Sequence, residues 1–545
     1  MKHYLQKLEE ITVRCWDKAS LCDYGGDKLT YGQVATSIAR FHLCFEKAGI
    51  KKGDKIALCA KNSARWAVSF LAVNTYEAVI VPILADFHPD SVVNLVNHSE
   101  SMILFTDADI WAKLDPARMP GLKMAVSTQD FSVLYCKSEV LANAYASLDE
   151  EFAKKYPNGF GKQDVHYPHD NFKDLAIINY TSGTTRDPKG VMLTYEAMSD
   201  TVDFSQSHMP NSPEDNIVSM LPLAHMYGLA IEFIYPCCSG CAIYFLGKTP
   251  SPSLLLKAMK DVQPYMVVTV PLVMEKVYKS SIKPVISKPA MKVLLAIPGV
   301  NGIIYKKVGE KLTSAFGGKV RVFIMGGAAL NPEVEKCFKK IKLHYTVGYG
   351  MTEACPLLGY EAWDKFVPGS CGKPVHDVRI DSEDPQKIAG EIQARGANIT
   401  IGYFKNPEAN AMAFTEDGWL RTGDLGIMDK DGNIFIKGRS KSMILSANGQ
   451  NIYPEELEAI VNNQPYAVES VVVDRAGKIV AMVYLDTESM KKDGLSEEDM
   501  AEIPEKIRIN SNRQLPLYSQ IAKVEVVRVP FEKTPKMSIK RFLYK

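Results

Sequence analysis

The sequence has no run of about 18 apolar residues, which is the length that a membrane-spanning helix needs. Its N-terminal segment, MKHYLQKLEEITVRCWDKAS, is too polar to contain the apolar core of a secretory signal. Basic residues are not in excess, since the net charge is +1, and this balance gives no electrostatic reason to expect a nucleic-acid partner. These absences predict a soluble, cytoplasmic protein that binds no nucleic acid.

Paired cysteines are also lacking. The 11 cysteines are odd in number and dispersed, which favours reduced thiols over a disulfide framework. One cluster is formed by Cys237, Cys238 and Cys241, but no second Cys or His pair lies nearby at the spacing that zinc sites require. We therefore expect neither a disulfide-stabilised domain nor a zinc site.

The 545 residues are enough for several domains, because domains usually contain roughly 100–200 residues. Helical patterns alternate with short apolar runs from residue 29 onward: a helix is predicted in 29–50, a strand in 55–60, a helix in 66–78 and a strand in 79–84. Similar apolar runs return at 174–180, 215–224, 265–271 and 319–327. Strands that alternate with helices indicate an α/β fold with parallel pairing.

The pattern changes near residue 437. Residues 423–441 contain β-like runs separated by an Asp-Gly turn, which is typical of a hairpin. A compact unit of about a hundred residues follows, with the pattern helix, two strands, helix and strand. The predicted fold class is therefore α/β, with a large N-terminal α/β domain of several subdomains (1–438) and a small C-terminal α+β domain (439–545).

A loop rich in glycine and hydroxyl side chains, TSGTTRDPKG at Thr181–Gly190, lies between two apolar runs. Such a loop suits a polyphosphate because glycines expose backbone N–H groups, threonines add donors and Lys189 adds a point charge. It is not a Walker A loop, because G-x-x-x-x-G-K-[ST] is absent. On its own the loop is equally compatible with a polar surface turn.

Further segments of the chain indicate the function of the loop. Together they resemble, in order, the motifs of the adenylate-forming superfamily of acyl-CoA synthetases, luciferases and nonribosomal adenylation domains. The matching segments are LPLAHMYG at 221–228, MGGAAL at 325–330, GYGMTEACP at 348–356, TGD at 422–424, GRSK at 438–441 and GQNIYPEELE at 449–458. The resemblance spans nearly the whole chain. It implies ATP-dependent activation of a carboxylic acid to an acyl-AMP and then to an acyl-CoA, with release of AMP and pyrophosphate.

The resemblance also implies cofactors and residue roles. ATP, Mg²⁺ and coenzyme A would be used. Nucleotide-binding positions are Thr181, Ser182, Gly183, Thr184, Thr185, Gly327, Ala328, Ala329, Tyr349, Gly350, Met351, Thr352, Asp424 and Arg439. Among them, Thr184 would hold the terminal phosphates together with Lys189, Thr352 would bind the α-phosphate, Tyr349 would stack on adenine, and Asp424 would accept hydrogen bonds from the ribose hydroxyls.

Four other positions complete the implied machinery. Glu353, with Thr184, would hold the magnesium ion, which prefers oxygen ligands. His225 would border the reacting carboxylate and gate the thiol tunnel. In this superfamily the C-terminal domain rotates between the two half-reactions, and Lys441 occupies the hinge position. Gly449 would face the pantetheine tunnel of coenzyme A.

The chain departs from the superfamily pattern at two positions. Arg186 replaces a glycine of the phosphate loop. Ser538 stands where the catalytic lysine of adenylation is expected, and a serine carries no charge to balance the acyl-phosphate. We expect adenylation to survive with help from Lys536, Lys540 or Arg186. The alternative functions are an acyl-AMP ligase that loads a carrier protein and a weakened acyl or nucleotide sensor.

The acid itself is implied only by resemblance, which points most to bacterial long-chain fatty acid–CoA ligases and so to a medium- or long-chain fatty acid. Residues 289–308 form an apolar stretch with basic ends. They could contact a membrane surface peripherally. A packed helix and turn, broken at Pro298 and Gly299, is the favoured interpretation, because most apolar stripes belong to a core.

Overall fold

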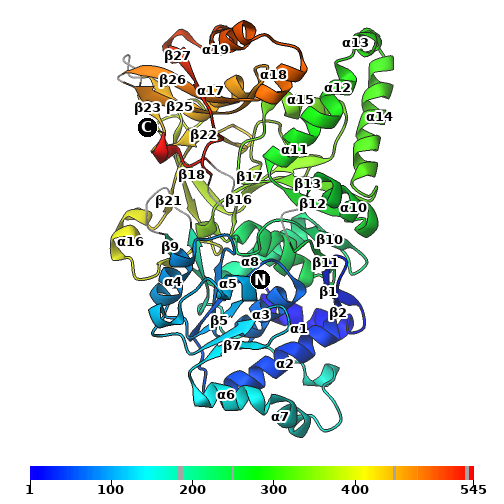
Figure 1. The fold of residues 1–545 in the computed structure, drawn as a ribbon, viewed down its shortest axis with the longest axis vertical. Coiled ribbons are helices and arrows are strands. Elements are labelled where there is room, and N and C mark those ends of the chain that lie inside the picture. Colours follow the sequence, from blue (N-terminus) through cyan, green and yellow to red (C-terminus); the bar gives the residue numbers. More distant parts are fainter. Residues whose placement is uncertain (182–187, 248–250, 446–449, 476, 534–538, 545) are drawn as a thin grey trace.

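The structure is a computed structural model that describes residues 1–545 except 182–187, 248–250, 446–449, 476, 534–538 and 545. Two large sheets and their helices build most of the molecule, and a smaller domain at the C-terminal end lies at the top of Figure 1. This arrangement confirms the predicted fold class. Among the described residues, no helix is long and apolar enough to cross a membrane.

The first sheet has eight strands and a parallel centre. Its order is β20 (Gly402–Tyr403), β9 (Lys189–Thr194), β8 (Leu175–Thr181), β4 (Val79–Ile83), β3 (Lys55–Cys59), β5 (Ile103–Thr106), β6 (Met124–Ser127) and β7 (Val133–Cys136). The pairs from β8 to β6 are parallel, whereas β9, β20 and β7 join antiparallel. The central strands are buried on both faces, which explains their nearly continuous apolar runs.

The second sheet has seven strands, and only β2 is antiparallel. Its order is β14 (Tyr345–Val347), β13 (Val322–Met325), β12 (Met266–Thr269), β10 (Asn216–Ser219), β11 (Ala242–Phe245), β1 (Ala19–Asp23) and β2 (Lys28–Thr30). The apolar runs predicted at 215–224, 265–271 and 319–327 provide β10, β12 and β13.

Helices form the layers around and between these sheets. The central layer is α1 (Tyr4–Arg14), α2 (Tyr31–Lys47), α3 (Ala64–Thr75) and α8 (Tyr195–His208), and it shares one buried cluster with strands of both sheets. On the outer faces, α4 (Pro89–His98) packs on the first sheet, while α10 (Pro252–Val262) and α15 (Pro332–Lys340) pack on the second. Helix α2 starts where the sequence predicts, because Thr30 and Gln33 form a capping box.

Smaller sheets connect this body to the C-terminal domain. They are β15 (Tyr349–Gly350), β16 (Leu357–Tyr360) and β17 (Lys373–Pro374), followed by β18 (Asp377–Asp381), β19 (Gly390–Arg395), β21 (Leu420–Met428) and β22 (Ile434–Arg439). Strands β21 and β22 form the antiparallel hairpin predicted from the Asp-Gly turn.

The C-terminal domain has the predicted α+β pattern. It contains β23 (Ile444–Leu445), β24 (Asn451–Ile452), α17 (Pro454–Asn462), β25 (Ala467–Arg475), β26 (Lys478–Leu485), α18 (Thr487–Lys492), α19 (Glu497–Asn512) and β27 (Lys523–Val527). Strand β26 pairs antiparallel with β25 and parallel with β27. The buried apolar side chains of the C-terminal domain form clusters of their own, made only of residues from 444 onward.

One prediction is wrong in part. Residues 289–308 form α13 (Pro289–Ala296) and the start of α14 (Val300–Ala315), with the expected break between them, but α13 buries none of its residues, all of which the structure describes. In Figure 1 both helices lie at the right-hand edge, beyond α11 (Pro271–Val277) and α12 (Lys283–Ile286). The apolar residues of α13 therefore do not belong to the core.

Candidate active site

A cavity of about 1410 Å³ lies where strands of the second sheet end. Residues at or just after the carboxyl ends of three parallel strands line it: Ser219 ends β10, Thr269 ends β12 and Gly326 follows β13. Ligands of open α/β sheets bind at this edge of the strands. The cavity is larger than the roughly 300–1,000 Å³ of most small-molecule pockets, so it has room for more than one substrate group.

The predicted phosphate loop connects two antiparallel strands. Thr181 ends β8 and pairs with Lys189, the first residue of β9. The ammonium of Lys189 lies 4.9 Å from the ring centre of Tyr403, on the neighbouring strand β20. Ser182, Gly183, Thr184 and Thr185 lie outside the described residues, as does Arg186. The strands therefore place Lys189 at the entrance of the loop and beside an aromatic ring.

Tyr403 connects Lys189 to the predicted magnesium ligand. Its hydroxyl donates to Oε1 of Glu353 at 2.9 Å, and Glu353 is buried. The lysine and the glutamate are more than 160 residues apart in sequence, and a single tyrosine contacts both. No sequence motif points to Tyr403. An aromatic residue in the short run Ile401–Phe404 carries no signal of such a role without knowledge of the β9–β20 pairing.

The predicted ribose ligand has two partners. Asp424 is 4% exposed and pairs with Arg439 across β21 and β22; the Nε–Oδ1 distance is 2.7 Å. Tyr349 donates its hydroxyl to Oδ2 of Asp424 at 2.7 Å. Burial raises the pKa of Asp424, and the Arg439 guanidinium and the Tyr349 hydroxyl oppose that rise. Three of the predicted nucleotide-binding residues are thus in direct contact.

The predicted adenine segment follows β13. Gly326, Gly327 and Ala328 line the cavity, whereas Ala329 is an exposed neighbour. A Cβ on Gly326 would lie 3.0 Å from the ring of Tyr227, and Gly327 has a φ of +86°, which favours glycine. The backbone here therefore runs close to the wall of the cavity.

The segment after β14 is equally tight. Gly350, Met351 and Thr352 line the cavity. A Cβ on Gly350 would lie 2.0 Å from the carbonyl oxygen of Pro356, so only glycine fits. Thr352 and Glu353 begin a short 3-10 helix, and both are buried. The motif GYGMTEACP therefore places Thr352 at the cavity and the buried carboxylate of Glu353 next to it in sequence.

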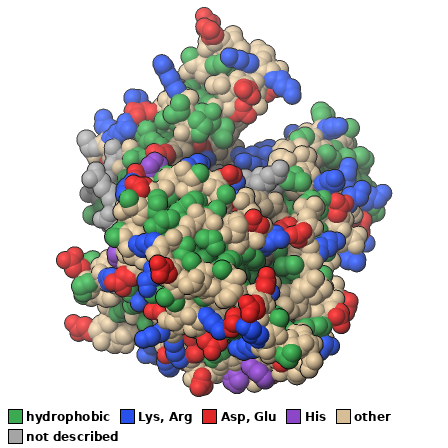
Figure 2. Space-filling view, turned by 60° about the horizontal axis from the view of Figure 1, so that its bottom comes forward, with side chains coloured by type: hydrophobic (Ala, Val, Ile, Leu, Met, Phe, Trp, Pro, Cys, Tyr) green, Lys and Arg blue, Asp and Glu red, His purple; other side chains and the backbone are tan. Residues whose placement is uncertain are grey.

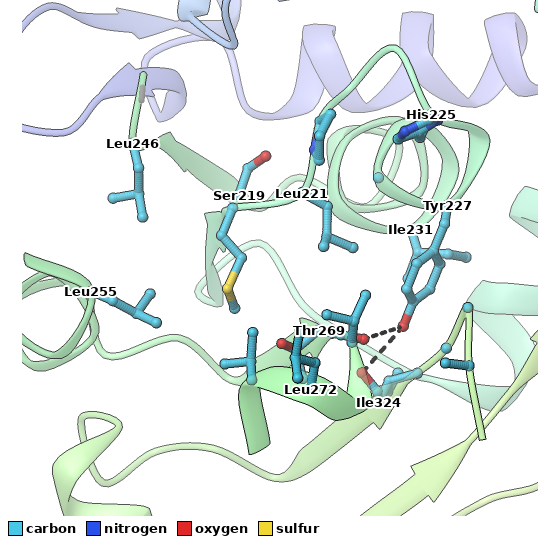
Figure 3. Close-up of a pocket in the computed structure, with 18 of the residues that line it drawn as sticks. Ser219, Leu221, His225, Tyr227, Ile231, Leu246, Leu255, Thr269, Leu272 and Ile324 are labelled. Carbon is cyan, nitrogen blue, oxygen red and sulfur yellow. Dashed lines mark hydrogen bonds between the residues drawn. The ribbon is translucent and has the colours of Figure 1, made fainter. Parts of the chain in front are cut away.

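His225 borders the apolar part of the cavity (Figure 3). It lies in the turn before the π-helix η3 (Gly228–Ile234), where Leu229 N–H donates to its carbonyl oxygen at 2.8 Å. Glu232 of this helix is fully buried and accepts hydrogen bonds from the backbone of Met220 and Leu221 and from Ser219 Oγ. Burial raises the pKa of Glu232 to about 8. No sequence motif points to this carboxylate, which holds the segment before His225.

Beyond His225 the cavity wall is mostly apolar, and its polar members are Lys276, Ser280, Ser281 and Lys311. The apolar side chains come from α10, α11, the π-helix η4 (Tyr278–Ile282), α12, α14 and the residues that directly follow β11 and α14; they are Leu246, Leu255, Leu256, Leu272, Val273, Val277, Ile282, Val285, Val308, Leu312 and Phe316. Figure 3 shows Leu246, Leu255 and Leu272 around this space. One cavity thus joins the nucleotide motifs to an apolar chamber.

The remaining predicted residues lie in or near the C-terminal domain. Lys441 is an exposed turn residue, two positions after the end of β22. Gly449, Lys536 and Ser538 lie outside the described residues. Lys540 forms an ion pair with Glu532 of its own domain.

The carboxylate of Glu353 fits the predicted magnesium ion. Among the described residues, no cluster of three or more His, Cys, Asp or Glu side chains could hold a metal on its own. Mg²⁺ usually takes only one or two carboxylates and completes its shell with phosphate oxygens and water. Glu353 provides such a carboxylate next to the Lys189 end of the phosphate loop.

The family of the chain follows from its sequence pattern as well as its site. The pattern of the AMP-binding enzyme family matches residues 8–404, and that of the AMP-binding enzyme C-terminal domain matches residues 441–544. The first match covers more than half of the chain. The protein therefore belongs to this family, and it is an adenylate-forming ligase of the acid–thiol class.

Similar proteins include two that are named as long-chain fatty acid–CoA ligases. The rat "Long-chain-fatty-acid--CoA ligase 5" is 29% identical over 466 residues, which cover 79% of this chain and 67% of the relative. The Mycobacterium bovis "Long-chain-fatty-acid--CoA ligase FadD15" is 28% identical and covers 94% of this chain and 90% of the relative. The solved structure of the anthranilate CoA ligase AuaEII with anthranoyl-AMP has the same fold, with a TM-score of 0.79 over 99% of this chain and 96% of that chain, at 19% identity.

Proposed function

We propose that this ligase activates a long-chain fatty acid to its acyl-adenylate and then to its coenzyme A thioester, releasing pyrophosphate and AMP. The observation that carries the proposal is the continuity of the cavity. A long apolar wall begins beside His225 and reaches α12 and α14, and the same cavity is lined by Tyr349 and Thr352. An acyl chain in the apolar part would present its carboxylate to the nucleotide. The names of the two relatives support the same class of acid.

The chemistry asks for positioning more than for a base. A carboxylate is already ionised at neutral pH, so it can attack the α-phosphorus of ATP directly, and pyrophosphate leaves. Lys189 would neutralise the terminal phosphates, and Thr352 would donate to the α-phosphate. Tyr349 and Arg439 use only part of the acceptor capacity of the Asp424 carboxylate, so Asp424 would also accept hydrogen bonds from the ribose hydroxyls. Glu353 would hold Mg²⁺, which supplies charge neutralisation at the phosphates.

The second half-reaction requires a thiol near the adenylate carbonyl. We infer that the C-terminal domain, residues 439–545, rotates about Lys441 to admit the pantetheine arm along Gly449. Support comes from the separate buried clusters of this domain and from the exposed turn that joins it to β22. Its described polar contacts with the body include Lys437–Glu456 and a hydrogen bond from Asn331 to Asn463, and such contacts are few enough to break.

A chain-length series tests the proposal. Purified full-length protein is given ATP, Mg²⁺ and acetate, octanoate or palmitate, with and without coenzyme A, and pyrophosphate release and product mass are measured. We expect palmitoyl-CoA as the preferred product. Adenylate that is not passed to coenzyme A would indicate a ligase for a carrier protein. Absence of pyrophosphate release with every acid would indicate that Ser538 marks a lost adenylation step and that the protein is a sensor.

A further inference from the structure

Helices α13 and α14 expose an unusual number of apolar side chains. Val293 is 66% exposed, Ile303 is 61% exposed, and Leu294 and Ile297 are also exposed. Soluble proteins rarely display large apolar patches that have no partner. A short helix that packs against nothing is also marginal in water. Helix α13 has only 8 residues, and none of them is buried. The surface formed by α13 and the first turns of α14, here called the α13 surface, therefore lacks a partner in the described structure.

The charge around these side chains is of one sign. Residues 283–311 contain six lysines and one acidic residue, Glu310, in a chain whose net charge is only +1. The lysines are Lys283, Lys288, Lys292, Lys306, Lys307 and Lys311. Glu310 pairs with Lys306 at 3.8 Å, and Lys283 pairs with Glu333, so most of the positive charge remains uncompensated. Figure 2 shows lysine and arginine side chains next to hydrophobic ones on the right-hand lobe of the molecule.

Helix α14 and the elements that precede α13, η4 and α12, form the far wall of the apolar chamber. Ile282 and Val285 line the cavity from η4 and α12, and Val308 and Leu312 line it from α14. Val285 is exposed to solvent as well as to the cavity. The chamber wall therefore reaches solvent next to the α13 surface. In sequence, Val285 lies fewer than ten positions before the exposed residues Val293 and Leu294.

We propose that the α13 surface docks on an anionic lipid bilayer, and that the acyl substrate enters the chamber from the bilayer beside Val285. Exposed apolar side chains insert into the interface, and surrounding lysines contact anionic headgroups. A protein partner would not need this pairing of insertion side chains with lysines around the mouth of an acyl chamber. The delivery part rests on the proposed function, whereas docking on the bilayer does not.

Sedimentation with vesicles tests the docking without catalysis. The full chain, with no ATP, is mixed with vesicles of phosphatidylcholine alone or with about 30% phosphatidylglycerol. We expect binding to the anionic vesicles, and we expect it to weaken when salt rises from about 0.05 M to about 0.5 M. The double variant Val293→Ser/Leu294→Ser should lower the partition constant by about tenfold or more, because two insertion side chains are lost. Lys288→Gln/Lys292→Gln should remove the preference for anionic vesicles.

A matched control uses exposed apolar residues elsewhere. Leu517 and Val529 of the C-terminal domain are 88% and 69% exposed, so Leu517→Ser/Val529→Ser removes comparable surface without touching α13. It should bind vesicles as the unchanged protein does. All four positions are exposed, and circular dichroism melts verify that each variant is folded.

Three results would overturn the docking proposal. The first is no binding to anionic vesicles, and the second is unchanged binding of the Val293→Ser/Leu294→Ser variant. The third is a dimer in light scattering that this variant dissociates, which would make the α13 surface an interface between copies. For delivery, the variant should lose activity on palmitate presented in vesicles but keep activity on octanoate in buffer. Equal loss on both acids contradicts delivery, and a lack of thioester with every acid contradicts the proposed function instead.

Discussion

Behind the proposed nucleotide end of the cavity, buried charged side chains have hydrogen-bonded partners, whereas the walls of the proposed acyl end are helices with mostly apolar side chains. Glu353 and Asp424 accept from tyrosine hydroxyls, and Arg439 adds an ion pair. The acyl end includes residues of two π-helical segments, η3 and η4. π-helical turns are rare and occur often at functional sites. Fixed geometry at one end and an adaptable apolar wall at the other suit a reaction with one constant substrate and one of variable length.

If the nucleotide end depends on its fixed charges, Asp424→Asn should cause the largest loss. The amide cannot form the ion pair with Arg439, and one of its two polar atoms becomes a donor that faces hydroxyl groups. Hydrogen bonds to charged groups contribute about 1.5–3 kcal/mol each, so we expect kcat/KM for ATP to fall at least about a hundredfold. Acid-dependent ATP–pyrophosphate exchange measures this loss. The control is Asp431→Asn, an exposed residue of the β21–β22 turn. A loss below about threefold would remove Asp424 from the nucleotide site.

Tyr403 tests whether contacts between motifs matter as much as the motifs. Tyr403→Phe removes the hydrogen bond to Glu353 but keeps the ring beside Lys189. We expect kcat to fall about tenfold and the Mg²⁺ concentration for half-maximal activity to rise, because a hydrogen bond to a carboxylate is lost. Tyr403→Leu, which also removes the ring, should be worse. Tyr76→Phe removes a hydroxyl that donates to the carbonyl of Ile50, outside the cavity, and is the control. Unchanged Mg²⁺ dependence in Tyr403→Phe would restrict Tyr403 to a packing role.

At the acyl end, substitution should change selectivity more than rate. Leu272 of α11 lines the apolar chamber (Figure 3). A tryptophan there takes space from long chains, and overpacking typically costs about 1–3 kcal/mol. We expect Leu272→Trp to lower kcat/KM for palmitate about tenfold while acetate or octanoate and the KM for ATP change little. Competition between the two acids in one reaction gives the ratio directly. An equal loss for all acids would show that the chain does not occupy this part of the cavity.

The two ends of the cavity also differ in how well the sequence predicts them. Thr352, Glu353, Asp424 and Arg439 lie in motifs whose order identifies them; Thr352 lines the cavity, and Asp424 and Arg439 form an ion pair. Tyr403 could not be found this way, because its role depends on the pairing of β20 with β9 across about 200 residues. Helix α13 was misjudged because periodicity shows that a stripe is apolar but not what covers it.

Glu232 holds the segment Ser219–Leu221 of the cavity wall, and the effect of changing it should be the smallest in rate and visible mainly in stability. Burial raises its pKa from 4.5 to about 8, so between these values the folded protein keeps a proton that the unfolded chain releases. The free energy of unfolding should therefore fall as pH rises through this window, by at most about 1.4 kcal/mol per pH unit, and level off above about pH 8. Glu232→Gln should lack this contribution in urea titrations at several pH values, whereas Glu416→Gln, at an exposed position, should retain it. Parallel pH profiles for Glu232→Gln and the unchanged protein would mean that the three hydrogen bonds from Ser219, Met220 and Leu221 keep the carboxylate ionised, and that the segment before His225 is held by charge.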